Sequence, residues 1–171
     1  MKSIVIYSSL TGNTKQVAEA ITSVLPAGTP CVSMKEVPSD ISSYDLVFAG
    51  FWVDKGTANK EARDVLGILH NPYIALFATA GVPPQMAHAK ESLINAANCL
   101  PDGVEPVGTF ICQGKVDPKV IEMMYKMFPK GHSHGQSADR DARHKQAAVH
   151  PNEDDFKAAQ DFAQYILAKL D

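Results

Sequence analysis

The fold of this chain is decided near its start by Ser9-Leu10-Thr11-Gly12-Asn13-Thr14, which stands between an apolar run and a helical pattern. The apolar run, Ile4 to Tyr7, is β-branched and aromatic, as expected of a parallel strand covered on both faces. From Thr14 to Leu25 the apolar residues recur at helical spacing. A strand, a short hydroxyl-rich loop and a helix in direct succession predict the beginning of an α/β domain.

The six-residue loop has the chemistry of a phosphate site. At a helix start several backbone N–H groups lack partners, and the helix dipole presents its positive end. A phosphate would be bound there by these N–H groups and by the hydroxyls of Ser9, Thr11 and Thr14. Gly12 permits close approach of the backbone, and the loop contains no Lys or Arg. An alternative interpretation is an ordinary helix start with Thr11 or Asn13 as the N-cap.

Short apolar runs alternate with helical patterns along the rest of the chain, which predicts a parallel sheet with helices between its strands. Further strands are expected at 31–34, 45–52, 73–78 and 104–112. Further helices are expected at 57–69, 85–99, 118–128, 138–149 and 153–170. We therefore expect one domain over residues 1–171, with an inserted segment at about 115–151 after the fifth strand.

The loop at 9–14 resembles the S/T-x-T-G-x-T phosphate loop of the flavodoxins, in the same place after the first strand. The resemblance covers nearly the whole chain, because the order of elements also agrees with the flavodoxin-like sheet of order 2-1-3-4-5. It implies an α/β three-layer sandwich, with helices on both faces of a five-stranded parallel sheet, and FMN as the cofactor. The loop matches neither a Walker A sequence nor the three spaced glycines of the Rossmann fingerprint.

Ligands of doubly wound sheets lie beyond the carboxyl ends of the strands, where the strand order reverses. The loop from Phe51 through Val53 and Asp54 to Gly56 should therefore touch the ligand, and it contains the only tryptophan, Trp52. The resemblance implies that Trp52, or less favourably Phe51, stacks on the flavin ring, and that Gly56 supplies a peptide beside it. Alternatively, the tryptophan closes the core and the glycine forms an ordinary turn.

The next strand ends at Thr79-Ala80-Gly81, which occupies the other position that faces the flavin. The resemblance implies that the Thr79 side chain and the N–H groups of Ala80 and Gly81 bond the pyrimidine edge of the ring. An ordinary strand–helix turn explains these residues nearly as well. This loop lacks the customary aromatic and acidic residues of flavodoxins, so one face of the ring would be open to a substrate or partner.

The segment 115–151 is rich in methionine and histidine. Met123, Met124 and Met127 form either an adaptable surface for a partner protein or the buried face of a helix. The histidines lack cysteine or carboxylate at ligand spacing, so a solvent loop is favoured over a metal site. The segment could also fold over the flavin, with Gln113-Gly114-Lys115 leading into it.

Composition excludes several classes of protein. The 16 basic and 19 acidic residues give a formal net charge of −3 without a basic cluster, which argues against nucleic-acid binding. The three cysteines, Cys31, Cys99 and Cys112, are far apart and lie in apolar stretches, as expected of reduced thiols in a cytoplasmic protein. No segment has the length and apolarity of a signal peptide or a membrane span, so no membrane partner is expected.

These observations predict an FMN electron-transfer protein that passes electrons to a dedicated reductase partner. No carboxylate pair, Ser/His/Asp set or reactive cysteine competes for the role of catalytic site. An alternative is an FMN-dependent NAD(P)H or quinone reductase acting on a small flat acceptor. A third is a flavin-free binding or regulatory module, although Ser8-Ser9 stands where a receiver domain needs acidic residues.

Overall fold

The computed structural model of the chain describes residues 1–170 and contains one sheet with the strand order β2-β1-β3-β5-β6. These five strands are parallel, and a sixth, two-residue strand pairs antiparallel with β3. In chain order the strands are β1 (Ser3–Tyr7), β2 (Cys31–Ser33), β3 (Leu46–Asp54), β4 (Thr57–Ala58), β5 (Tyr73–Ala80) and β6 (Gly108–Gln113). The expected flavodoxin-like topology is confirmed, since β4 only adds to the numbering.

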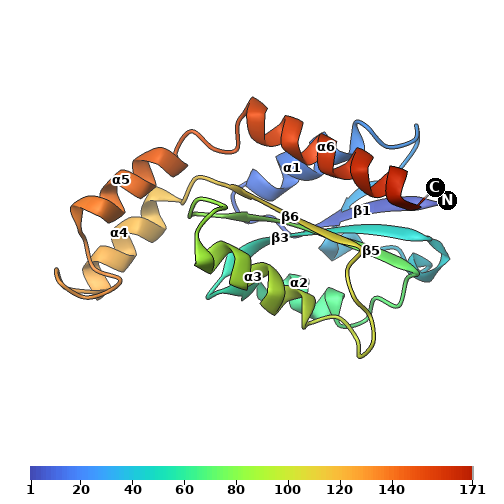
Figure 1. Cartoon of the computed structure of the whole chain (residues 1–171). Helices are drawn as coiled ribbons and strands as arrows, with labels where there is room; N and C mark the ends of the chain where they lie inside the picture. Colours follow the sequence, from blue (N-terminus) through green and yellow to red (C-terminus); the bar gives the residue numbers. More distant parts are fainter. Residues whose placement is uncertain (171) are drawn as a thin grey trace.

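Helices cover both faces of the sheet, as Figure 1 shows. One face carries α1 (Asn13–Thr22) and α6 (Glu153–Leu170), and the other carries α2 (Lys60–Leu66) and α3 (Ala87–Ala97). Two short 3-10 helices, η1 (Met34–Glu36) and η2 (Ile41–Ser43), lie between β2 and β3. No helix within residues 1–170 has the length and apolarity needed to cross a membrane.

The segment that was expected as an insertion projects from the sheet as an arm, which we define as residues 115–151. It contains α4 (Pro118–Met127) and α5 (Ala138–Ala147) and lies beyond the carboxyl ends of the strands, at the end of the molecule opposite the two chain termini (Figure 1). Its two ends are joined where the backbone N–H of Lys115 donates to the carbonyl of His150 at 2.8 Å. The arm therefore has a closed base next to the end of β6.

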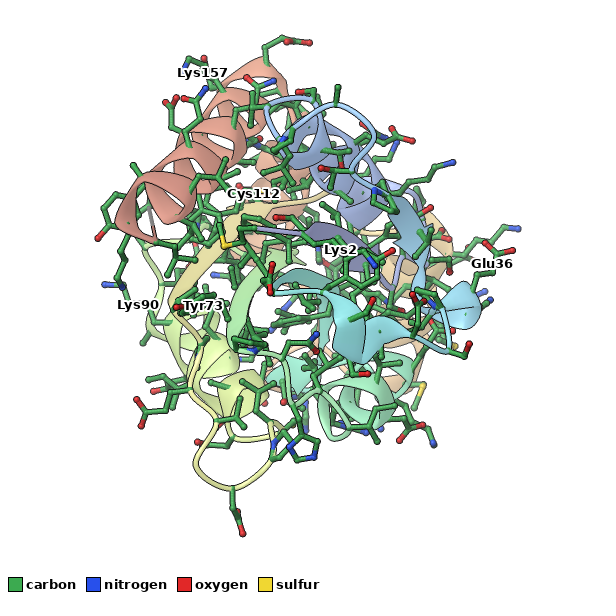
Figure 2. All side chains as sticks on the ribbon, turned by 90° about the vertical axis from the view of Figure 1, so that its right-hand side faces the viewer. Lys2, Glu36, Tyr73, Lys90, Cys112 and Lys157 are labelled. Atoms are coloured by element: carbon green, nitrogen blue, oxygen red, sulfur yellow. The ribbon has the colours of Figure 1, made fainter. Side chains whose placement is uncertain are left out.

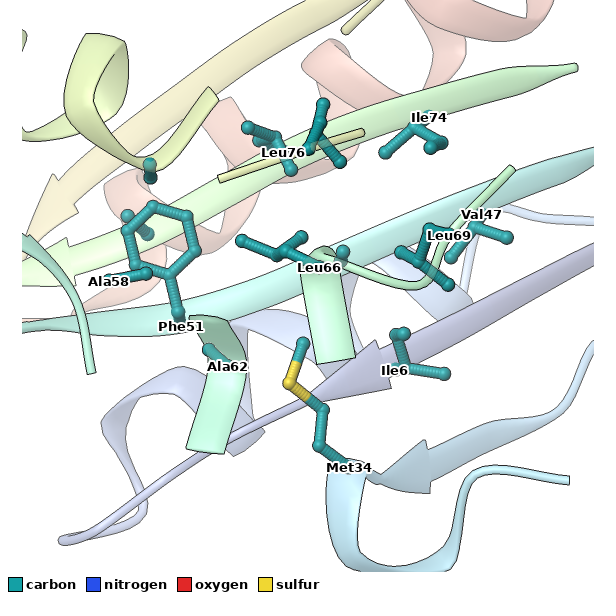
Figure 3. Close-up of a cluster of buried hydrophobic side chains, with 14 of the residues drawn as sticks. Ile6, Met34, Val47, Phe51, Ala58, Ala62, Leu66, Leu69, Ile74 and Leu76 are labelled. Atoms are coloured by element: carbon teal, nitrogen blue, oxygen red, sulfur yellow. The ribbon is translucent and has the colours of Figure 1, made fainter. Parts of the chain in front are cut away.

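The core is divided by the sheet into two apolar clusters. Figure 3 shows the cluster between the sheet and α2, where Ile6, Phe51, Leu66 and Leu76 are all fully buried. The second cluster joins the sheet to α1 and α6. Burial on both faces explains why the central strands are continuous apolar runs rather than alternating ones.

Two elements begin three or more residues later than expected. The helix expected from Thr57 begins at Lys60, because β3 continues to Asp54 and the chain turns back to form β4. Lys55 and Gly56 make this turn with positive φ angles of 50° and 78°. The last strand begins at Gly108 rather than at residue 104, since only residues 108–113 pair with β5.

Candidate functional site

A pocket of about 610 Å³ opens at the carboxyl ends of β1 and β3, where the strand order reverses. Four loops and the arm form its wall. The lining residues are Ser9, Leu10, Thr11, Asn13, Thr14, Trp52, Val53, Asp54, Lys55, Thr79, Ala80, Gly81, His88, Gly114, Lys115, Val116, Asp117, Val120, Met124, Phe128 and His134. The structure thus brings together all but three of the residues proposed from the sequence. Those three are Gly12, Phe51 and Gly56.

The first loop ends at the N-terminus of α1. Gly12 adopts the left-handed conformation at φ 93°, which glycine reaches without strain, and the helix begins at Asn13. The Ser9 hydroxyl accepts a hydrogen bond from the Gly12 N–H at 3.1 Å. The first N–H groups of a helix have no partner within the helix, so this end of α1 presents donors and a positive dipole to the pocket.

Asn13 is the polar side chain in the pocket that lacks part of its bonding. It is only 7% exposed, and its Nδ2 donates to the Lys115 carbonyl at 2.9 Å. Its Oδ1 is buried without a hydrogen-bond partner. A buried acceptor left unpaired costs about 1–3 kcal/mol.

Hydrogen bonds tie the loops of the pocket to one another. The hydroxyls of Thr14 and Thr79 lie 2.9 Å apart and are buried, which joins the start of α1 to the end of β5. The Gly114 N–H donates to the Ala80 carbonyl at 2.8 Å. A Cβ on Gly81 would stand 2.5 Å from Val116 Cγ2, so the third loop and the base of the arm are in close contact. The loops of the wall are therefore held against one another by contacts within the protein, as a preorganised site requires.

The two aromatic candidates point in opposite directions, because successive side chains of a strand alternate between the two faces. Trp52 is half-buried and lines the pocket. Phe51 is fully buried in the cluster under α2, so it is not available to stack on a ligand. Gly56 lies in the turn before β4, where its carbonyl accepts from Asn95 Nδ2 at 2.8 Å.

The arm forms a part of the pocket wall that the sequence did not assign to particular residues. Val120, Met124 and Phe128 follow one another at intervals of four residues and all line the pocket, as one stripe of α4 and its C-terminal end. The methionine-rich helix was visible in the sequence, but which side of it faces the sheet depends on the tertiary structure. His88, at the start of α3, also lines the pocket and carried no sequence signal.

Charges in the pocket are balanced. Asp54 and Asp117 line it together with Lys55 and Lys115. Nearby, on β6, burial raises the pKa of the Cys112 thiol to about 12, and Asp155 contributes to the rise. This thiol therefore stays protonated at neutral pH and is a poor nucleophile.

A doubly wound parallel sheet, with a hydroxyl-rich loop before α1 and a pocket at the reversal of strand order, defines a flavodoxin-like α/β protein. The model of the flavodoxin domain family matches residues 4–164. The chain belongs to this family.

Relatives and solved structures agree with this assignment. The flavodoxin-like domain-containing protein BilS of Clostridioides difficile (strain CD3) is 35% identical over 99% of this chain and 98% of its own. BilS of Clostridium symbiosum (strain WAL-14163) is also 35% identical, over 95% of this chain and 94% of its own. A flavodoxin of Streptococcus pneumoniae superposes with a TM-score of 0.57 at 15% identity, covering 98% of both chains. A Lactobacillus acidophilus flavoprotein in complex with FMN superposes with a TM-score of 0.52 at 18% identity, and the match covers 65% of this chain and 93% of that one. Both likenesses show the fold.

FMN is the cofactor of flavodoxins, and the residues of the pocket fit it. The start of α1 offers N–H groups and hydroxyls to a phosphate. Trp52, half-buried in the pocket wall, offers an aromatic face to a flat ring. The volume of about 610 Å³ lies within the range of pockets for ligands of this size.

Proposed function

We propose that the protein binds FMN in this pocket and passes electrons to a protein partner. The observation that carries the proposal is the N-terminus of α1, with its N–H donors and the Ser9 and Thr11 hydroxyls, in a pocket at the reversal of strand order. A polar ligand with an anionic end satisfies these donors. Membership of the flavodoxin family supports FMN as that ligand.

Each part of the wall has a distinct task under this proposal. The N–H groups and hydroxyls of residues 9–14 bind the phosphate, and Trp52 holds one face of the ring. Thr79 and the N–H groups of Ala80 and Gly81 bond the polar edge of the ring. The apolar stripe of α4 excludes water from the other side. FMN, when bound, supplies the redox chemistry, and the protein supplies binding, orientation and electrostatics.

A fluorescence titration of FMN with the purified protein tests the proposal. We expect quenching that saturates at one FMN per chain, and Trp52→Ala should weaken binding by roughly tenfold, about 1.4 kcal/mol, since stacking on an aromatic ring contributes on this scale. Tyr165→Ala is the matched control, because Tyr165 is a 63% exposed aromatic on α6, outside the pocket wall. The absence of quenching at micromolar protein would contradict the proposal and favour a flavin-free binding module.

A second candidate is an FMN-dependent reductase that acts directly on a small flat acceptor. The extent of the pocket favours it, because the wall continues past the strand-end loops to α4 and His134. Purified protein loaded with FMN would then sustain turnover of NAD(P)H with a quinone. Reduction that occurs only through a second protein would favour the electron carrier.

A further inference from the structure

Successive sides of α4 face different surroundings. Val120, Met124 and Phe128 line the pocket. Tyr125 faces α5, since its hydroxyl donates to Asp141 Oδ1 at 2.8 Å and its ring lies 6.0 Å from that of His144. These contacts leave a further side of the helix, which we call the outer stripe. Its members are Lys119, Met123, Lys126, Met127 and Lys130.

The outer stripe is an apolar centre with a basic surround. Met123 is 54% exposed and Met127 is 66% exposed, and all three lysines are exposed. The spacing of four, seven and eight residues from Lys119 places Met123, Lys126 and Met127 along one side of α4, and Lys130 follows three residues after the helix ends. Exposed methionine at this density is unusual for a surface helix, and its flexible side chain adapts to partners of varied shape.

Charge is divided unevenly between the arm and the rest of the molecule. Residues 115–151 contain seven Lys and Arg against four Asp and Glu, whereas the remaining residues contain nine against fifteen. The arm therefore carries a formal charge of +3 on a body of −6. Such a distribution orients an approaching acidic protein toward the arm.

The outer stripe also lies close to the pocket. The inner and outer stripes belong to one helix, whose diameter with side chains is about 10–12 Å. A protein seated on the outer stripe would therefore be separated from the pocket by one helix width. Figure 1 shows α4 beyond the carboxyl ends of the strands and away from the four helices that cover the sheet.

We propose that the outer stripe is the docking surface for the redox partner, a protein whose own docking surface is acidic around an apolar centre. The inference rests on the proposed electron-transfer function and specifies the partner. The apolar contact of Met123 and Met127 supplies affinity, while the lysines increase the rate of association and select acidic proteins.

Two redox proteins of opposite charge serve as probes: rubredoxin, which is acidic, and cytochrome c, which is basic. Binding of each to the oxidised, FMN-loaded protein is measured by calorimetry or NMR, without electron transfer. We expect rubredoxin to bind in preference to cytochrome c and to lose affinity on addition of 0.5 M salt, because salt screens charged contacts.

Two triple variants change the net charge equally. Lys119→Glu/Lys126→Glu/Lys130→Glu should weaken rubredoxin binding by roughly tenfold or more. Lys35→Glu/Lys90→Glu/Lys157→Glu is the control, since these lysines are exposed and lie outside the arm; Figure 2 labels Lys90 of α3 and Lys157 of α6. Each triple includes one lysine paired four residues away, Lys126 with Glu122 and Lys157 with Asp161. Equal losses in the two triples, or preferred binding of cytochrome c, would overturn the inference.

A third variant and an FMN titration separate this inference from the proposed function. Met123→Ser/Met127→Ser leaves the charge unchanged and should also weaken rubredoxin binding; unchanged binding would show that the apolar centre takes no part. Quenching of FMN should be the same in the wild type and the arm triple, because the outer stripe does not line the pocket. Failure of the wild type to bind FMN contradicts the proposed function, whereas normal FMN binding without selective rubredoxin binding contradicts the docking surface alone.

Discussion

Asn13 joins three parts of the molecule within one side chain. It is the first residue of α1, it donates to the carbonyl of Lys115 at the base of the arm, and it lines the pocket. Because Asn13 belongs to the loop at 9–14, the proposed phosphate site, a negative charge at this position should weaken phosphate binding. The residue therefore allows the phosphate and ring parts of the site to be tested separately.

Replacement of Asn13 by Asp should weaken FMN binding by roughly 10- to 100-fold. The carboxylate loses the bond to Lys115 and places a negative charge next to the phosphate, an effect of about 1–3 kcal/mol. Riboflavin, which lacks the phosphate, should lose much less affinity. Fluorescence titrations of both flavins measure the difference. Equal losses for the two would show damage to the loop and would contradict a phosphate at this position.

At the scale of elements, the buried strands were the most predictable part of the fold. β1, β3 and β5 are continuous apolar runs, and the loop at 9–14 has a sequence that identifies its place between strand and helix. The start of α2 was not predictable in this way. Thr57 and Ala58 fit a helical pattern, but they pair with Asp54 and Val53, and this tertiary contact overrides the local preference.

For the arm, the sequence predicted the helices but not which side of each helix faces the pocket. Its helices lie close to their expected bounds, because proline and serine mark their starts and the apolar spacing is regular. Its methionines, however, include both Met124 of the pocket wall and the exposed Met123 and Met127. The sequence offered a partner surface and a buried face as alternatives, and the structure places different methionines on different sides of the helix.

Met124 and Met123 provide a matched pair on α4. Met124→Ala should weaken FMN binding by roughly three- to tenfold, because it removes part of the apolar wall, an effect of about 1 kcal/mol for a partly buried side chain. Met123→Ala should leave the FMN dissociation constant unchanged, since Met123 does not line the pocket. Titrations of both variants decide the matter. The same affinity in the two would contradict a role for α4 in the cofactor site.

His144 makes the packing of α4 against α5 sensitive to pH. Burial lowers the pKa of His144 below its ordinary value, and Arg140 and Arg143 add to this effect while Asp141 opposes it. Its ring contacts that of Tyr125, and neither ring nitrogen has a hydrogen-bond partner. A histidine with a lowered pKa stabilises the folded arm above its ordinary pKa of about 6.5, and this contribution is lost as the pH falls through the lowered value.

We therefore expect amide hydrogen exchange in α4 and α5, corrected for the intrinsic pH dependence, to be several-fold faster at pH 5 than at pH 7.5. His144→Phe keeps an aromatic ring and removes the titrating group, so the corrected rates should no longer depend on pH in this range. The helices α1 and α6, which pack on the sheet, serve as the internal reference. A pH dependence that persists in the variant would assign the effect to another group.

The whole molecule combines a buried core with a site built from the loops at the carboxyl ends of the strands and from the arm. The core residues on the strands, on α1 and on α6 are mostly fully buried, whereas no residue of α4 is buried. The buried sheet and its helices therefore supply most of the stability, whereas the pocket lies at the carboxyl ends of the strands. Ligand binding should therefore raise global stability by mass action and protect the arm locally.

FMN at about 100 times its dissociation constant should stabilise the folded chain by about 2.7 kcal/mol, because it binds the native state and not the unfolded one. For a chain of 171 residues this corresponds to a rise in Tm of roughly 5–10 °C, which differential scanning fluorimetry measures. Hydrogen exchange should slow most at residues 9–14, at 79–81 and in α4, since these line the pocket together. Protection of the two loops without protection of α4 would mean that the flavin contacts the sheet edge alone and that the arm acts only on partners. A Tm that does not respond to FMN would exclude the pocket as a flavin site.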